Sequence, residues 1–128
     1  MDDQETHEAD CDGWKARLTR QDQFSLVRAK GHSCAGRYCV VNILEMPPDG
    51  MGRAAFSISR RYSKLAVERN RARRLFREVY HRLYGSLPVA WVVFIPRHKM
   101  LVAKLDDVLE DVCRVARSLL GDAFKEEP

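Results

Sequence analysis

Long apolar runs are missing from this sequence of 128 residues. No stretch approaches the ~18 consecutive apolar residues that a membrane-spanning helix needs, so no contact with a membrane is expected. The first residues (MDDQETHEADCDG) are acidic and polar, whereas a secretory or mitochondrial signal begins with basic residues. Both absences favour a cytoplasmic protein, and the length suits one domain with a sizeable core.

Cysteine is present, but without the spacing of a metal site or of a disulfide framework. The four cysteines are Cys11, Cys34, Cys39 and Cys113, and no two of them form a CxxC pair. His32 with Cys34 and Cys39 has the residue types of a metal site, but the spacing matches no common ligand motif. Reduced thiols, partly in the core, are therefore the favoured interpretation.

Acidic residues are scarce in one strongly basic segment. Residues 60–82 contain nine Lys or Arg against only Glu68 and Glu78. Residues 1–13 hold six acids and no Lys or Arg, so the rest of the chain carries a net charge of +10, although the whole chain carries +4. A segment this basic commonly meets a polyanion, and a solvated helix face is the alternative. Residues 1–13 are predicted to be a disordered acidic tail.

The first helix is predicted over residues 20–30. Thr19 and Asp22 resemble a capping box at its start, and Gly31 would end it. Phe24 lies on its narrow apolar stripe.

Two strands are predicted next, at residues 37–45 and 53–60. The PPDG turn at residues 47–50 separates them, which suggests an antiparallel hairpin. Phe56 and Ile58 would face the core. The other face of this strand carries small side chains, which would let an extended partner approach: Ala55, Ser57 and Ser59.

The basic segment is predicted to form a second helix, which begins after Ser63 and ends near Tyr84, before Gly85. At ~100° per residue, its apolar residues share one side. These are Ala72, Leu75, Phe76, Val79 and Leu83. The opposite side carries Asn70, Arg73, Arg74 and Arg77. A helix that needs only solubility would interleave acidic residues four positions apart, so this segregation favours a binding face.

A strand and a helix complete the prediction. The apolar run VAWVVFI at residues 89–95 is typical of a central strand that is covered on both faces. A helix is expected over residues 104–120, with acidic residues in its first half. Because of this negative charge, the last helix is expected to pack behind the sheet and not to contact the polyanion.

Residues 56–78, FSISRRYSKLAVERNRARRLFRE, resemble the signature of the protein subunit of bacterial ribonuclease P. In that family a strand that ends in Ser and two basic residues leads into an RNR-x-[KR]-R helix. The corresponding pieces here are Ser59-Arg60-Arg61, Arg69-Asn70-Arg71, Arg73-Arg74 and Arg77-Glu78. The likeness covers about residues 17–120, and it includes RLTRQDQF before the first helix and LPVAWVVFIPR at the late strand.

The resemblance implies an α+β sandwich with the element order α-β-β-β-α-β-α. Helices would pack on its four-stranded sheet, which gains a short strand near Ser33. A left-handed βαβ crossover would run through the basic helix, although right-handed crossovers are the rule. The RNA-binding domain would span residues 14–121, and residues 122–128 would form a C-terminal tail.

The resemblance also implies an activity. Ribonuclease P removes the 5′ leader from precursor tRNA, and its RNA subunit is the catalyst, so no catalytic side chain is expected in this chain. The protein would bind both the catalytic RNA subunit and precursor tRNA. It would help Mg²⁺ to bind at the RNA active site, while the protein itself would hold no cofactor.

Two groups of site residues follow from the same resemblance. The residues expected to bind the RNA subunit are Arg60, Arg61, Lys64, Arg69, Asn70, Arg71, Arg73, Arg74 and Arg77. The residues expected to form the leader-binding cleft are Phe24, Arg28, Arg37, Ala55, Ser57 and Ser59, with Arg37 on a neighbouring strand. Arg28 stands where many members have a second aromatic, and Asn42 where some have Tyr. Arg28 would then take the place of that aromatic, either by stacking its guanidinium group on a base or by contacting a phosphate.

Two other functions are compatible with the sequence. His81, close to Glu78 on the basic helix, has the chemistry of a general base, but no second acid, nucleophile or metal cluster accompanies it. A ribosomal or other structural RNA-binding protein would share the basic helix. Cleavage of precursor tRNA with and without an RNA subunit separates these functions.

Overall fold

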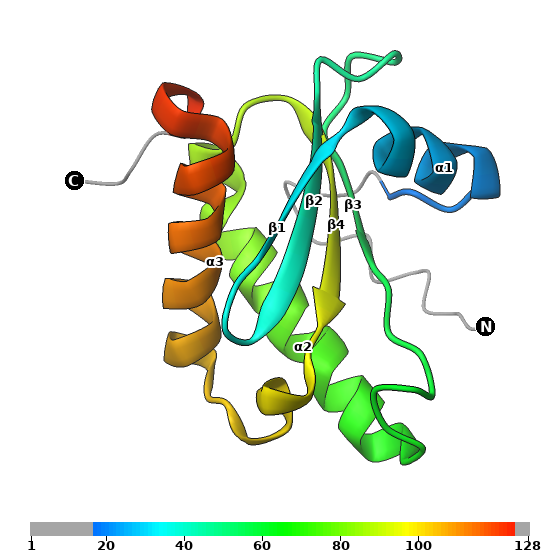
Figure 1. Cartoon of the computed structure of the whole chain (residues 1–128), viewed down its shortest axis with the longest axis vertical. Coiled ribbons are helices and arrows are strands. Elements are labelled where there is room, and N and C mark those ends of the chain that lie inside the picture. Colours follow the sequence, from blue (N-terminus) through cyan, green and yellow to red (C-terminus); the bar gives the residue numbers. More distant parts are fainter. Residues whose placement is uncertain (1–16, 125–128) are drawn as a thin grey trace.

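Three α-helices and a four-stranded sheet make up residues 17–124, the part of the chain that the structure, a computed structural model, describes (Figure 1). The elements are α1 (Gln21–Lys30), β1 (His32–Ala35), β2 (Cys39–Glu45), β3 (Arg53–Phe56), α2 (Ala66–Leu83), β4 (Ala90–Pro96) and α3 (Leu105–Leu120), with short 3-10 helices η2 (Tyr84–Ser86), η3 (His98–Val102) and η4 (Gly121–Ala123). Their order confirms the expected α+β architecture, including the short strand near Ser33.

The fold extends beyond the boundary expected at residue 121. Gly121–Ala123 form η4, and the side chain of Phe124 is buried in the core. The acidic tail expected at residues 1–13 lies outside the described residues, as do Cys11 and the last four residues. Of the helices that the structure describes, none combines the length and the apolar character needed to cross a membrane.

The start of α1 differs from the expected capping box. The Gln23 side-chain oxygen accepts hydrogen bonds from the backbone N–H groups of Thr19 (2.9 Å) and Arg20 (3.0 Å). Asp22 instead forms an ion pair with the Arg20 guanidinium at 2.7 Å. The prediction that Thr19 and Asp22 cap this helix is therefore wrong, because Gln23 reaches both orphan N–H groups from the third helical position.

The strand order β1-β2-β4-β3 places β4 in the interior of the sheet, as predicted (Figure 1). Ala90, Val92 and Phe94 point into a large core formed with α2 and α3. Trp91 and Val93 point into a smaller core formed with α1 on the other face. Because both faces of β4 are buried, its sequence needs no polar alternation.

The antiparallel hairpin expected between the second and third strands is wrong. β2 pairs antiparallel with β4, and β3 pairs parallel with β4, so β4 lies between them. The connecting loop is held over the start of β4 because the Asp49 carboxylate accepts hydrogen bonds from Trp91 Nε1 (3.1 Å) and the Met51 N–H (3.0 Å). The chain thus crosses from β3 to its parallel neighbour β4 through α2. The left hand of this crossover stays a prediction.

Asp111 is a fully buried carboxylate that joins α3 to the turn between β1 and β2. It accepts hydrogen bonds from the backbone N–H groups of Arg37 (2.9 Å) and Tyr38 (2.8 Å), and the Arg114 guanidinium lies 3.3 Å away. A side chain on Gly36 would overlap with this carboxylate, so the turn needs glycine there. The predicted position of the last helix, behind the sheet, is confirmed, and one of its acids fixes a turn.

Replacing Asp111 by alanine should lower the free energy of unfolding by roughly 2–4 kcal/mol, because the N–H groups of Arg37 and Tyr38 lose a charged acceptor inside the protein. Urea denaturation measures the loss. The matched control is Glu110→Ala, since Glu110 is an exposed neighbour on the same helix and should change stability by no more than about 0.5 kcal/mol. Equal losses for the two variants would contradict the clamp.

Candidate nucleic-acid interface

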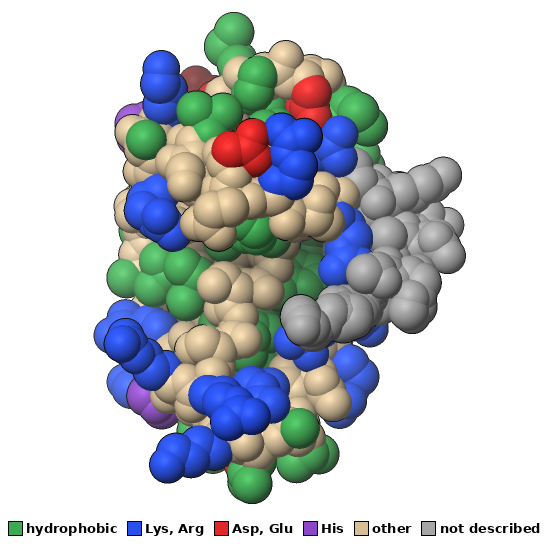
Figure 2. All heavy atoms as spheres, turned by 90° about the vertical axis from the view of Figure 1, so that its right-hand side faces the viewer, with side chains coloured by type: hydrophobic (Ala, Val, Ile, Leu, Met, Phe, Trp, Pro, Cys, Tyr) green, Lys and Arg blue, Asp and Glu red, His purple; other side chains and the backbone are tan. Residues whose placement is uncertain are grey.

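The parallel pairing of β3 and β4 brings the residues after both strands to one edge of the sheet. The Ser57 N–H bonds to the Phe94 carbonyl (2.8 Å), and the Arg97 N–H bonds to the Tyr38 carbonyl in the β1–β2 turn (2.9 Å). Exposed Lys and Arg side chains from three separate segments gather at this edge. They are Arg37, Arg60, Arg61, Lys64, Arg97 and Lys99. Figure 2 shows Lys and Arg side chains grouped over the lower part of this side of the molecule.

The helix α2 has the two faces that its periodicity predicts. Its buried residues are Ala72, Phe76, Val79, Tyr80 and Leu83, and Leu75 packs half-buried against them. On the opposite face Asn70 and Arg74 are exposed, while Arg73 and Arg77 are half-buried. The Arg73 guanidinium donates to Asn70 Oδ1 at 2.9 Å. Tyr80 was not predicted to be buried, although its place four residues after Phe76 is a signal for it.

Two predicted RNA-binding arginines direct their guanidinium groups to the protein itself. Arg69 donates to the Ser63 carbonyl at 2.9 Å. Arg71 donates to the carbonyls of Met100 and Leu101, both at 3.3 Å, and to that of Ala103. Of the Arg69-Asn70-Arg71 motif, only Asn70 is fully exposed. The face of α2 opposite its buried residues therefore brings together Asn70, Arg73 and Arg74, and it does not include the Arg71 guanidinium.

A hollow lies beside this basic edge, on the face of the sheet that α1 partly covers. Figure 2 shows it below α1, with hydrophobic side chains on its floor. The register Asn42–Val93–Ala55 runs across three strands on this face, and Val40 pairs with Ile95 one step nearer to the basic edge. The half-buried floor residues are Val40, Asn42, Ala55 and Ile95.

Four of the predicted cleft residues lie around this hollow. Phe24 is half-buried and packs against the smaller core from α1, and Arg28 is exposed one turn further along α1. Ala55 lies on the floor, and Ser57 is exposed just past the end of β3. The strand is shorter than expected, because β3 ends at Phe56.

Ser59 and Arg37 lie elsewhere than expected. Ser59 belongs to the turn that leads toward α2, where its side-chain oxygen accepts from the Arg61 N–H at 3.2 Å. Arg37 precedes β2, in the β1–β2 turn, so its expected place on a strand is wrong. It lines a pocket of about 360 Å³ together with Arg97, His98 and Lys99.

The residues Arg97, His98 and Lys99 were not predicted as part of the site. The ring of His98 stacks on buried Tyr62, with the ring centroids 6.3 Å apart. This contact connects the segment after β4 with the segment after β3. The available signal was a run of three basic or titratable residues directly after the apolar strand, but its neighbours depend on the parallel pairing of β3 and β4.

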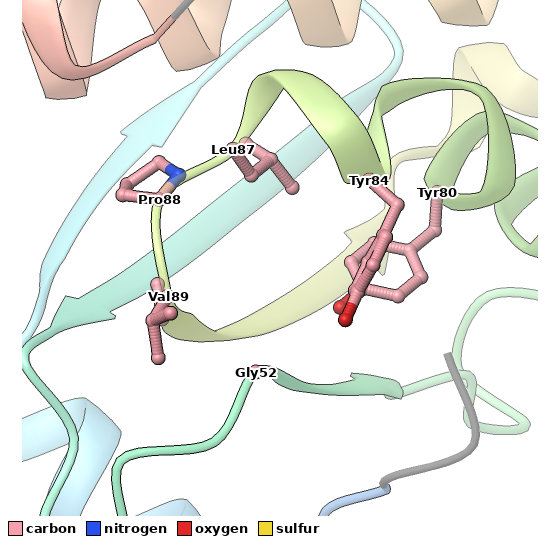
Figure 3. A pocket seen from close by; sticks show the side chains of 7 residues that line it. Gly52, Tyr80, Tyr84, Leu87, Pro88 and Val89 are labelled. Carbon is pink, nitrogen blue, oxygen red and sulfur yellow. The ribbon is translucent and has the colours of Figure 1, made fainter. Parts of the chain in front are cut away.

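A further hollow of about 130 Å³ lies at the opposite end of β4 (Figure 3). Tyr80 of α2 and Tyr84 of η2 line it side by side, with their ring centroids 5.6 Å apart. Its other lining residues are Gly52, Leu87, Pro88, Val89 and Ala90. Burial raises the pKa of the Tyr80 hydroxyl. Among the described residues that line this hollow there is no Lys or Arg, so it lacks a cation that would attract a phosphate.

The groups that could support chemistry by the protein itself are dispersed or engaged. His81 is exposed on α2, but its neighbour Glu78 forms an ion pair with Arg82 at 2.9 Å. Burial, and then the charge of Asp111, raise the pKa of the Cys39 thiol to about 12. Cys34 and Cys113 are free and half-buried. Within residues 17–124, no three His, Cys, Asp or Glu side chains are grouped as metal ligands would be.

Comparisons with known proteins identify the family. The family model for ribonuclease P matches residues 14–119. The chain is 34% identical over 108 residues to the ribonuclease P protein component of Dehalococcoides mccartyi, covering 84% of this chain and 83% of that protein. It is 32% identical over 110 residues to that of a Pseudanabaena species, covering 83% and 95%.

A solved structure has the same fold. The ribonuclease P protein from Thermotoga maritima superposes with a TM-score of 0.70 at 25% identity, covering 82% of this chain and 98% of that one. The match of the family model to most of the chain, the two relatives above 30% identity and this fold agree. The chain therefore belongs to the family of the ribonuclease P protein component.

Proposed function

We propose that this chain is the protein subunit of a ribonuclease P, which binds the catalytic RNA subunit and holds the 5′ leader of precursor tRNA. The observation that carries the proposal is the mainly apolar hollow beneath α1, bordered by exposed arginines from three segments. An aromatic side chain beside a basic surface suits single-stranded RNA, whose bases stack while its phosphates meet cations.

The two surfaces would divide the work of binding. Asn70, Arg73 and Arg74 lie on one face of α2, where guanidinium groups make forked, charge-assisted contacts with phosphates. The hollow would hold the leader through Phe24 and the floor of the sheet. Stacking and electrostatic contacts tolerate any base, so leaders of many sequences would fit.

The cleavage chemistry belongs, in this proposal, to the RNA subunit. Mg²⁺ would bind at the RNA active site, where it would activate the attacking water and stabilise the leaving oxygen. The side chains of this chain would contribute by placing the leader and by adding positive charge beside two RNA backbones that repel each other. Since precursor tRNA is processed where it is made in bacteria, the proposal also places the chain in the cytoplasm.

The test is cleavage of precursor tRNA by the protein alone, by a ribonuclease P RNA alone and by both, at limiting Mg²⁺. We expect no cleavage by the protein, slow cleavage by the RNA and a faster release of the intact leader when both are present. Specific cleavage by the protein alone would assign the chemistry to its side chains. Binding without any acceleration would favour a structural RNA-binding protein of the ribosomal kind.

A further inference from the structure

Arg71 is the only residue of the RNR motif whose guanidinium reaches a distant segment. It donates to three backbone carbonyls at the end of η3, those of Met100, Leu101 and Ala103. The Met100 carbonyl also accepts from the Ala103 N–H. Because the last carbonyls of a helical turn lack full partners within it, a planar group with several donors satisfies them well. These bonds tie η3 to the first half of α2.

The segment that Arg71 holds also carries the basic pocket. Met100 and Ala103 are buried, whereas His98 and Lys99 at the start of η3 are exposed. The pocket of about 360 Å³ lies between this segment and Arg37. Its two walls are joined by Arg97, which donates to the Gly36 carbonyl at 2.7 Å.

Tyr62 completes the connection between the two segments. Its side chain is buried, and its ring stacks on that of His98. Arg71 and Tyr62 thus contact the same segment, η3, at the basic edge of the sheet.

We propose that Arg71 is a positioning residue, which holds η3 on α2 so that Arg37, His98 and Lys99 face one another as a pocket for an RNA phosphate. The proposal rests on the proposed function for the identity of the ligand. It removes the Arg71 guanidinium from the direct RNA contacts that the RNR motif implies, and it adds a pocket outside that motif. The pocket has cationic walls and, among the described residues that line it, no acidic one, which suits a phosphodiester.

Arg71→Lys separates positioning from direct contact. A lysine keeps the charge, but its single ammonium group cannot serve three carbonyls in the fixed geometry of a guanidinium. We expect Arg71→Lys to weaken RNA binding by about two- to tenfold, the range of one typical hydrogen bond. The matched control is Arg74→Lys, because Arg74 is exposed on the same helix. If both arginines bound RNA mainly by their charge, both variants would keep nearly the RNA affinity of the unmodified protein.

A double-mutant cycle then tests whether Arg71 acts through the pocket. The second change is Arg37→Ala with Lys99→Ala, which removes two exposed pocket side chains. If Arg71 works by placing them, Arg71→Lys should add little to the loss that the pocket variant already shows. Arg74→Lys should add its full effect to the same pocket variant. The proposal would be overturned if the losses of RNA affinity from Arg71→Lys and from the pocket variant multiplied in the combined protein. It would also be overturned if the pocket variant bound RNA as tightly as the unmodified protein does.

The origin of the phosphate is decided by two binding measurements. Affinity of the protein for the RNA subunit is measured directly, and affinity of the assembled enzyme is measured for precursor tRNA with and without a leader. If the pocket variant binds the RNA subunit more weakly, the phosphate belongs to that subunit. If the pocket variant loses affinity only for leader-bearing tRNA, the phosphate belongs to the leader. Unchanged affinities in both would contradict an RNA phosphate at this pocket.

Hydrogen exchange in the protein without RNA keeps this inference separate from the proposed function. The N–H groups of Met100 and Ala103 bond to the Arg97 and Met100 carbonyls within η3. Arg71→Lys should speed their exchange, whereas Arg74→Lys should not. If the protein fails to accelerate any ribonuclease P RNA, the proposed function fails while this result stands. If exchange at η3 is unchanged by Arg71→Lys, the positioning role fails whatever the RNA does.

Discussion

Replacing Arg73 and Arg74 together by alanine should weaken binding to a ribonuclease P RNA by roughly ten- to fortyfold at near-physiological salt. Each phosphate that a protein neutralises contributes about 0.7–0.9 to the slope of log affinity against log salt. The double change should therefore flatten that slope by about one to two units. Arg74 is exposed, and Arg73 is oriented by its bond to Asn70, so neither loss should disturb the core.

The measurement is a salt titration of the affinity for the RNA subunit. A matched control is Lys104→Ala with Arg117→Ala, which removes the same formal charge from two exposed positions at α3. The control should keep the slope of the unmodified protein, because both residues belong to α3 and its start and not to the arginine face of α2. An unchanged slope for the Arg73 and Arg74 variant would place the phosphate contacts on another surface.

The periodicity of the sequence predicted the three α-helices and the strands β2, β3 and β4, because helices and buried strands leave a local pattern, whereas the short strand β1 was expected only from the family resemblance. The two faces of α2 follow from the spacing of Ala72, Phe76 and Val79 against Asn70 and Arg74. The interior place of β4 follows from its unbroken apolar run. Each of these features depends on residues within one element.

The pairing of strands could not be predicted in the same way. A turn between two strands is typical of a hairpin, but the Asp49 carboxylate bonds to Trp91 and holds the loop across the start of β4. The energetic preference comes from β4, whose two faces are buried beneath helices while its backbone pairs with β2 and β3, and β4 is far away in the sequence. The position of Arg37 in a turn, and its pocket with residues after β4, follow from this pairing.

The roles of single arginines were also beyond the sequence. Arg71 and Arg74 have the same side chain on the same helix, yet one bonds to backbone carbonyls of η3 and the other is exposed. A backbone carbonyl has no sequence signature, since every residue has one. The motif therefore predicted a basic surface correctly as a whole, but it could not separate the arginines that build the surface from those that are displayed on it.

Replacing Phe24 by alanine should weaken binding of leader-bearing precursor tRNA to the assembled enzyme by roughly tenfold or more, since one base stacked on an aromatic ring contributes about 1–3 kcal/mol. Leaderless tRNA should bind as before, because Phe24 lies at the hollow and not on the arginine face of α2. Equilibrium binding of the two RNAs to the same enzyme gives the ratio directly.

Two further variants separate stacking from packing at Phe24, which also contacts the smaller core. Phe24→Leu keeps an apolar side chain there but has no aromatic face, so it should lose leader affinity nearly as Phe24→Ala does. Leu26→Ala removes a half-buried side chain from the same helix and the same core, so it should lower stability without changing the ratio between the two RNAs. The ring supports α1 and does not stack on the leader if Phe24→Leu keeps the affinity ratio of the unmodified protein. The same follows if Leu26→Ala changes that ratio as much as Phe24→Ala does.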